Sequence, residues 1–293
     1  MASPRFGAVL TAMVTPFDDD GALDLDAAAS LARWLVDQGN DGLVVAGTTG
    51  EGATLTDDEK VDLWRAVREA VTVPVVAGTG TYDTRHTIHL TERAAEVGVD
   101  GALVVTPYYN RPSQAGLEAH FRAVAAATDL PVLVYDIPVR TGRKVAHDVL
   151  VRLASEVPGV VGVKDAAVDV AATARLVAAA PGFEVYSGND DQTLALLAVG
   201  AVGVIGVATH WSAGHHAEMI AAFAKGDVAR AREVNARLLA SYAFETSDEA
   251  PNPIPTKAML RVLGHRVGHC RPPVGPTPDG LEDRARAVLA GLT

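Results

Sequence analysis

Short apolar runs alternate with amphipathic stretches along most of the chain. Eight runs are rich in Val, Leu and Ile and show no polar alternation, which is typical of strands buried on both faces. They span 7–14, 42–46, 73–77, 101–106, 131–135, 160–164, 183–186 and 203–207. Between them, apolar residues recur at helical spacing and predict helices near 24–39, 56–67, 84–97, 113–127, 146–155, 169–180, 190–199 and 212–224.

Eight such alternations in about 225 residues predict a (β/α)8 TIM barrel. A doubly wound sheet is the alternative, but it usually has fewer strands and a phosphate-binding glycine loop after the first one. The rhythm changes after Gly226, where helical patterns follow at 227–244, 253–263 and 277–289 without further strands. We therefore expect a catalytic barrel over residues 1–226 and a C-terminal helical extension over residues 227–293.

Composition narrows the class of protein. The 293 residues are 48% hydrophobic and 21% charged, which fits a globular core. The net charge of −11 argues against nucleic acid and against anionic membrane surfaces as partners. The apolar stretch at 6–14 is too short to cross a membrane. One cysteine, Cys270, excludes an intrachain disulfide and fits a cytoplasmic protein.

The sixth apolar run ends in Lys164. A lysine in apolar surroundings is costly when charged, so burial lowers its pKa and makes it an amine nucleophile suited to Schiff-base formation. The alternative is a side chain that reaches solvent or pairs with Asp165. Because active sites of such barrels lie at the carboxyl ends of the strands, the residues at the other strand ends decide between the two interpretations.

Those strand ends carry suitable chemistry. The loop after the second run, Gly-Thr-Thr-Gly-Glu at 47–51, could hold a small carboxylate with Thr48, Thr49 and its backbone amides. Tyr135 ends the strand next to that of Lys164, and its phenol could pass a proton to the lysine or its adduct.

Three further strand ends add to the candidate site. Adjacent tyrosines, Tyr108 and Tyr109, follow the fourth run and point in different directions, so one of them could face the pocket and the other a neighbouring chain. Arg140 lies in a turn between Pro138 and Gly142, where its guanidinium suits a carboxylate. Gly188 forms a turn after the seventh run, and we count it with the substrate-binding residues.

The histidines offer weaker signals. His265 and His269 are four residues apart, but glycines interrupt any helix there and no carboxylate cluster accompanies them, so we expect a solvated loop and no metal site. His215 and His216 are expected on different sides of a helix, in exposed or interfacial positions.

Residues 47–51, 135–142 and 162–165 resemble motifs of the dihydrodipicolinate synthase family, within the pyruvate-dependent Schiff-base aldolases. The resemblance extends to 106–112, 187–188 and 251–255 and covers nearly the whole chain. It implies that Lys164 forms an imine with pyruvate. The derived enamine then attacks the aldehyde of L-aspartate β-semialdehyde and gives 4-hydroxy-tetrahydrodipicolinate, in the diaminopimelate and lysine pathway.

The resemblance also assigns roles. Thr48, Tyr135 and Tyr109 match a proton relay, with Tyr109 supplied across a subunit interface. Thr48 and Thr49 match the site of the pyruvate carboxylate, and Arg140 matches the residue that receives the carboxylate of the semialdehyde. The family uses no metal or organic cofactor, and its usual assembly is a homotetramer built from dimers.

Two points separate this chain from its alternatives. Lysine-inhibited members have His, Asn and Glu where Lys60, Tyr82 and His86 stand here, so we expect weak inhibition by lysine. A related aldolase or dehydratase acting on a 2-keto-3-deoxy sugar acid is the alternative function, and Arg140 favours the synthase because sialic acid lyases lack that arginine. A barrel that only binds a regulatory ligand would be expected to have lost Lys164 or Tyr135.

Overall fold

The computed structural model describes residues 4–292, so the outermost ends of the two predicted segments, 1–3 and 293, lie outside it. Eight parallel strands pair in chain order, and β8 closes on β1. The strands are β1 (Val9–Ala12), β2 (Gly42–Val45), β3 (Val75–Gly78), β4 (Gly101–Val105), β5 (Val132–Asp136), β6 (Val160–Asp165), β7 (Glu184–Ser187) and β8 (Gly203–Gly206). The predicted (β/α)8 barrel is confirmed.

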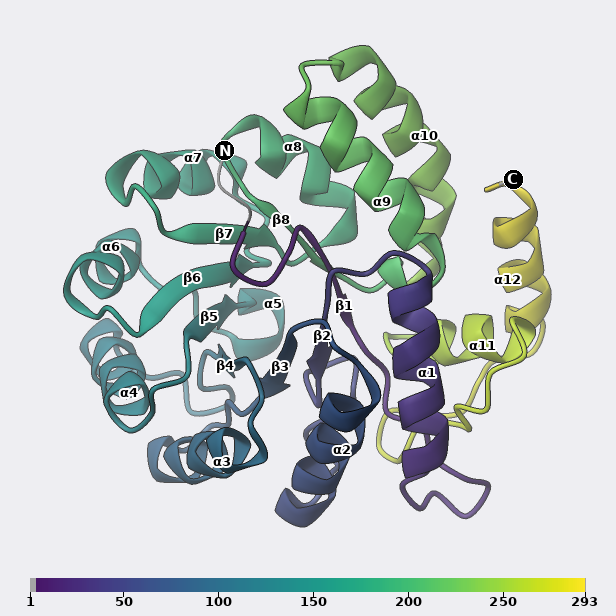
Figure 1. Ribbon diagram of the computed structural model, residues 1–293, viewed down its shortest axis with the longest axis horizontal. Helices are drawn as coiled ribbons and strands as arrows, with labels where there is room; N and C mark the ends of the chain where they lie inside the picture. The colour runs from purple at the N-terminus through teal and green to yellow at the C-terminus, as the bar shows by residue number, and fades with distance from the viewer. Residues whose placement is uncertain (1–3, 293) are drawn as a thin grey trace.

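Helices surround the barrel as an outer ring (Figure 1). They are α1 (Leu25–Asp37), α2 (Asp57–Ala70), α3 (Thr84–Val97), α4 (Gln114–Ala126), α6 (His147–Glu156), α7 (Val170–Ala179), α8 (Thr193–Ala198) and α9 (Thr209–Ala224). Their starts follow local capping chemistry. Asp24, Thr56, Asp83, Ser113 and Asp169 each accept a hydrogen bond from a backbone N–H of the first turn.

Two hydrophobic layers hold the barrel. The inner layer fills the barrel lumen and includes Phe6, Leu10, Val44, Leu133 and Ile205. The outer layer lies between strands and helices and forms two large clusters, one over α1 to α3 and the other over α4 to α7. Because both faces of every strand are covered by other residues, each strand appears in the sequence as a continuous apolar run.

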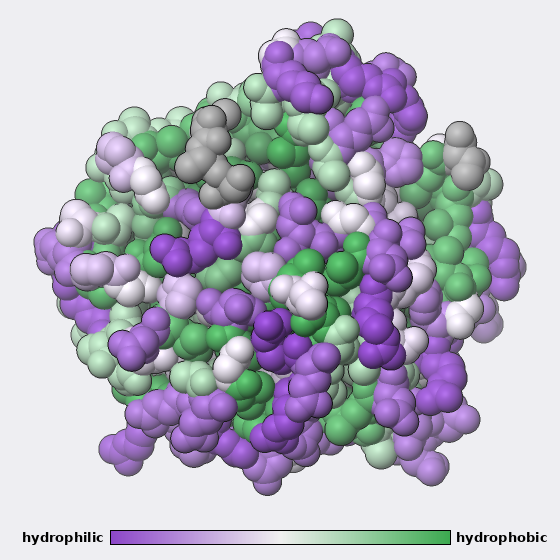
Figure 2. Space-filling view, in the orientation of Figure 1, coloured by the Kyte–Doolittle hydropathy of each residue, from purple (hydrophilic) through white to green (hydrophobic). Residues whose placement is uncertain are grey.

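After the barrel, α10 (Val228–Phe244), α11 (Ile254–Val262) and α12 (Leu281–Ala290) form the helical extension. The helix α10 packs along α9, while α11 packs against α12 and contributes Leu260 to the cluster that contains α1 (Figure 1). Figure 2 shows that the outward surfaces of α10 and α2 are hydrophilic. None of the helices formed by residues 4–292 has the length and apolarity needed to cross a membrane.

The structure corrects three of the predictions made from the sequence. Arg140 lies in one helical turn, α5 (Pro138–Thr141), rather than in a plain turn. The segment predicted as a helix at 190–199 begins as a 3-10 turn, η1 (Asp190–Gln192). The prediction that His216 is exposed or interfacial is wrong, because its side chain is fully buried beside Asp190.

Candidate active site

Lys164 is the next-to-last residue of β6, at the carboxyl end of the barrel. Its side chain is 4% exposed, so it does not reach solvent. It does not pair with Asp165 either, since that carboxylate accepts hydrogen bonds from Ala167 N and Thr173 Oγ1. Burial lowers the pKa of Lys164 to about 8, helped by the positive charge of Arg140 and opposed by nearby carboxylates. The neutral amine is therefore a minor but accessible form near neutral pH.

Tyr135 lies directly beside Lys164. The two residues are register partners in the adjacent strands β5 and β6, so both side chains point into the barrel. The Lys164 Nζ atom is 4.5 Å from the centre of the Tyr135 ring. Burial raises the pKa of Tyr135 to about 12, although Arg140 and a hydrogen bond with Thr48 act in the opposite direction. The phenol therefore stays protonated and can donate a proton.

The 47–51 loop follows β2, and the helical extension fixes it in place. Thr49 is buried, and its Oγ1 accepts a hydrogen bond of 2.9 Å from Asn252 Nδ2. Glu51 forms an ion pair with Lys257 of α11, with 2.7 Å between Nζ and Oε1 and both side chains fully buried. Glu51 also accepts the backbone N–H of Arg271. Contacts from residues about 200 positions away thus define the shape of this loop.

Arg140 follows β5 and Gly188 follows β7, the two strands on either side of β6. Arg140 is exposed at the end of α5, yet its charge acts on both Lys164 and Tyr135. Gly188 follows β7, and its N–H donates to Asp165 O at 2.8 Å. A Cβ at position 188 would lie 2.8 Å from the Ala166 Cβ, so only glycine fits this close approach.

Tyr109 does not join this group within one chain. Its side chain is 94% exposed, and its backbone has a φ of 71°. That left-handed conformation is uncommon for a residue other than glycine and holds the side chain in an outward position. Tyr108, by contrast, packs edge-on against Tyr82 with 5.7 Å between ring centres.

Three residues near the site were not among the candidates predicted from the sequence. Asn252 positions Thr49, and Asp190 and Glu245 place carboxyl groups close enough to influence Lys164. The Pro-Asn-Pro-Ile-Pro segment at 251–255 was a usable signal for Asn252. For Glu245, which lies in the extension beyond α10, the sequence offers no local signal.

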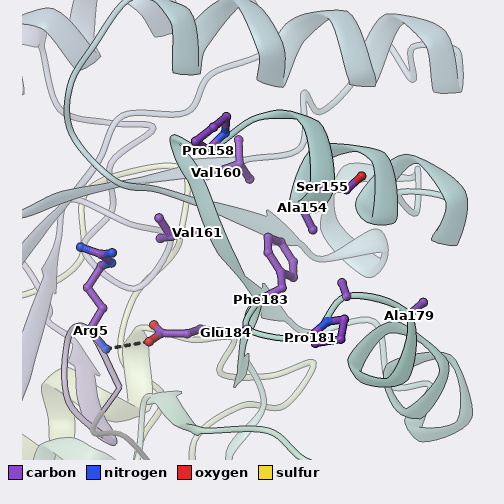
Figure 3. A pocket seen from close by; sticks show the side chains of 12 residues that line it. Arg5, Ala154, Ser155, Pro158, Val160, Val161, Ala179, Pro181, Phe183 and Glu184 are labelled. Atoms are coloured by element: carbon purple, nitrogen blue, oxygen red, sulfur yellow. Dashed lines mark hydrogen bonds between the residues drawn. The ribbon is translucent and has the colours of Figure 1, made fainter.

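A cavity of about 350 Å³ lies at the opposite end of the barrel (Figure 3). It is lined by Val160 and Glu184, which begin β6 and β7, and by Arg5 and Phe183. None of the predicted site residues borders it. In the part of the chain that is described, no group of three or more His, Cys, Asp or Glu side chains is placed to hold a metal ion.

A buried lysine of lowered pKa beside a protonated phenol, at the carboxyl end of a (β/α)8 barrel, is typical of aldolases that bind a carbonyl substrate as an imine. The comparisons make the class specific. Residues 5–290 match the dihydrodipicolinate synthetase family, and the chain belongs to that family.

Individual relatives agree with this assignment. The 4-hydroxy-tetrahydrodipicolinate synthase of Acidothermus cellulolyticus is 55% identical over 92% of this chain and 87% of its own length. The dihydrodipicolinate synthase of Cyanidioschyzon merolae, solved with lysine bound, superposes with a TM-score of 0.95 at 40% identity, covering 98% of each chain. A monomeric dihydrodipicolinate synthase variant gives a TM-score of 0.94 at 37% identity, covering 98% and 97%.

Proposed function

We propose that this protein is a lyase that condenses pyruvate with L-aspartate β-semialdehyde to give 4-hydroxy-tetrahydrodipicolinate, in the diaminopimelate and lysine pathway. The observation that carries the proposal is the buried Lys164, with a pKa of about 8, held beside Tyr135 in a chain of this family. The substrates are small molecules, and the chemistry needs only side chains because a protonated imine is itself an electron sink.

The reaction proceeds through covalent attachment to Lys164. The neutral amine attacks the keto carbon of pyruvate, water leaves, and the imine loses a proton from its methyl carbon to give an enamine. The enamine carbon then bonds to the aldehyde carbon of the semialdehyde, whose oxygen gains a proton. Finally the semialdehyde amino group attacks the imine carbon, closes the ring and releases the lysine amine.

The candidate residues fit this sequence of steps. Tyr135, whose pKa is raised to about 12, is the proton donor and acceptor beside Lys164, and a hydrogen bond with Thr48 ties it to the 47–51 loop. Thr48 and Thr49 receive the pyruvate carboxylate, aided by the backbone of that loop, and Gly188 leaves space for the substrate. Arg140, exposed at the mouth, receives the carboxylate of the semialdehyde.

The outward position of Tyr109 supports an oligomer. We propose that the chain forms a homotetramer, a dimer of dimers, in which Tyr109 from a neighbouring copy completes the proton relay. Sedimentation velocity tests the assembly, and a monomeric species that retains full activity would contradict it. We further propose that residues 1–226 act as the catalytic barrel and 227–293 as its supporting extension, and that the protein works in the cytoplasm.

Substrate choice has a direct test. Purified protein is incubated either with pyruvate and L-aspartate β-semialdehyde, or with a 2-keto-3-deoxy sugar acid alone, whose cleavage would release pyruvate, and products are followed by mass spectrometry. We expect 4-hydroxy-tetrahydrodipicolinate to form, and no cleavage of the sugar acid. Cleavage of the sugar acid without condensation would show a different aldolase, and no turnover of either would favour a ligand-binding barrel.

A further inference from the structure

Two carboxyl groups lie together behind Lys164. Asp190 opens the η1 turn after β7, and Glu245 caps the end of α10 in the helical extension. One backbone N–H, that of Ala208, donates to both of them, at 3.1 Å from Asp190 Oδ1 and 3.1 Å from Glu245 Oε2. Asp190 is fully buried and Glu245 is partly buried. Two carboxyl groups that share one amide donor there face each other closely, and the repulsion of like charges at that distance favours protonation of one of the two.

The surroundings decide which of the two carries the charge. Asp190 accepts a second backbone hydrogen bond, from Val207 N–H to Oδ2 at 2.8 Å. Glu245 accepts only the shared Ala208 N–H among the backbone donors of the described residues. Burial and the adjacent Asp190 raise the pKa of Glu245 well above its usual range. Burial opposes ionisation of Asp190 too, but its contacts with His216, the Val207 N–H and the charge of Lys164 together outweigh burial and keep the Asp190 pKa low.

His216 of α9 closes the cluster from the far side. Its Nδ1 lies 3.0 Å from the Ser212 carbonyl oxygen, which can only accept, so Nδ1 carries a hydrogen. Its Nε2 lies 3.4 Å from Asp190 Oδ1, and both side chains are buried. The cluster fits because β8 ends in Gly206. A Cβ at position 206 would lie 2.5 Å from Asp190 Oδ1.

Charged and titratable groups face this cluster from several elements. Lys164 comes from β6, Asp191 from η1, Tyr242 from α10 and His210 from α9. The positive charge of Arg140 disfavours the ammonium form of Lys164. The Asp190 and Glu245 pair acts in the opposite sense and favours that form. The charge on the carboxyl pair is thus the main local counterweight to burial.

We propose that Asp190 and Glu245 share one proton and present a single negative charge to Lys164, so that Glu245, supplied by the helical extension, is a positioning residue for the Schiff-base step. This inference rests on the proposed function. The reaction converts a neutral amine into a positively charged iminium, and a fixed negative charge nearby stabilises that product. The second carboxyl, kept neutral, donates a hydrogen bond that holds Asp190 in place.

The test compares isosteric variants by the pH dependence of pyruvate trapping, measured as the rate of borohydride-fixed adduct. The double variant Asp190→Asn/Glu245→Gln removes the shared negative charge, so the ammonium form of Lys164 is less stable and the acid limb of the rate profile moves to lower pH by about one to two units. Asp190→Asn alone is not sufficient, because the Glu245 carboxyl, freed of its like-charged neighbour, can take up the charge. Glu245→Gln replaces a neutral acid by a neutral amide, so the acid limb stays in place. Asp248→Asn and Glu249→Gln, which make the same changes at exposed residues that do not face the cluster, serve as matched controls.

An acid limb that stays in place in the double variant would overturn the proposal, and so would a shift of that size in Glu245→Gln alone, because both carboxyls would then be charged. Infrared difference spectra provide a second readout that needs neither pyruvate nor the Asp190 variant to fold. Wild type minus Glu245→Gln should show the C=O stretch of a protonated carboxyl at neutral pH, and its absence would also overturn the proposal. Failure of the wild type to trap pyruvate would instead refute the proposed function.

Discussion

Replacing Lys257 by methionine should destabilise the protein strongly, although Lys257 lies outside the catalytic group. Its ammonium and the Glu51 carboxylate are 2.7 Å apart, and both side chains are fully buried. At an effective dielectric constant of about 20, their attraction is about 6 kcal/mol, most of which offsets the cost of removing both charges from water. Methionine fills the space of the lysine stem but leaves Glu51 buried without its partner.

Loss of one member of such a pair costs about 3–5 kcal/mol. For a chain of this size we expect the melting temperature to fall by roughly 6–10 °C, measured by circular dichroism. Lys225→Met, an exposed lysine at the end of α9, is the control and should change stability by less than about 0.5 kcal/mol.

The double variant Lys257→Met/Glu51→Gln removes both charges and should recover much of the loss, with a coupling energy of about 2–3 kcal/mol. The reasoning would be refuted if Lys257→Met were as stable as Lys225→Met, or if the double variant were no more stable than Lys257→Met alone.

Three further predictions concern catalysis. Tyr135→Phe keeps the ring beside Lys164 but removes the proton donor, so kcat/KM should fall by about 10²–10⁴-fold in initial-rate assays, and an unchanged rate would exclude the proton role. The rate of pyruvate capture should rise as pH increases through about 8, because Lys164 is a non-nucleophilic ammonium below its pKa. A capture rate that does not change between pH 6 and 9 in stopped-flow measurements would contradict this. Lysine should inhibit weakly, because the buried Lys60 repels its ammonium and His86 is paired with Asp57 at 2.9 Å; half-inhibition by submillimolar lysine would refute it.

The barrel was predictable because its signals are local. Each strand is a continuous apolar run, and each of the long helices α2, α3 and α4 begins at a residue whose side chain caps it. The single turn α5 was missed because the four residues Pro138–Thr141 are too few to show a helical period.

For the site, too, the contacts that depend on local sequence were predictable and the long-range contacts were not. Lys164 and Tyr135 follow from strand ends in neighbouring strands, so their approach could be expected once the barrel was recognised. The contact of Asn252 with Thr49 joins residues 203 positions apart, and no local pattern encodes it. The error at His216 has the same origin, since its partner Asp190 lies on another element and Ser212 interrupts the regular helix before it.

The account depends most on Lys164 as the residue that binds pyruvate covalently. Protein is mixed with pyruvate, reduced with borohydride, digested and mapped by mass spectrometry, with Lys225 as an exposed internal reference. We predict one reduced pyruvyl adduct per chain, on the peptide that contains Lys164. No adduct, or an adduct on another lysine while Lys164 remains free, would contradict the account.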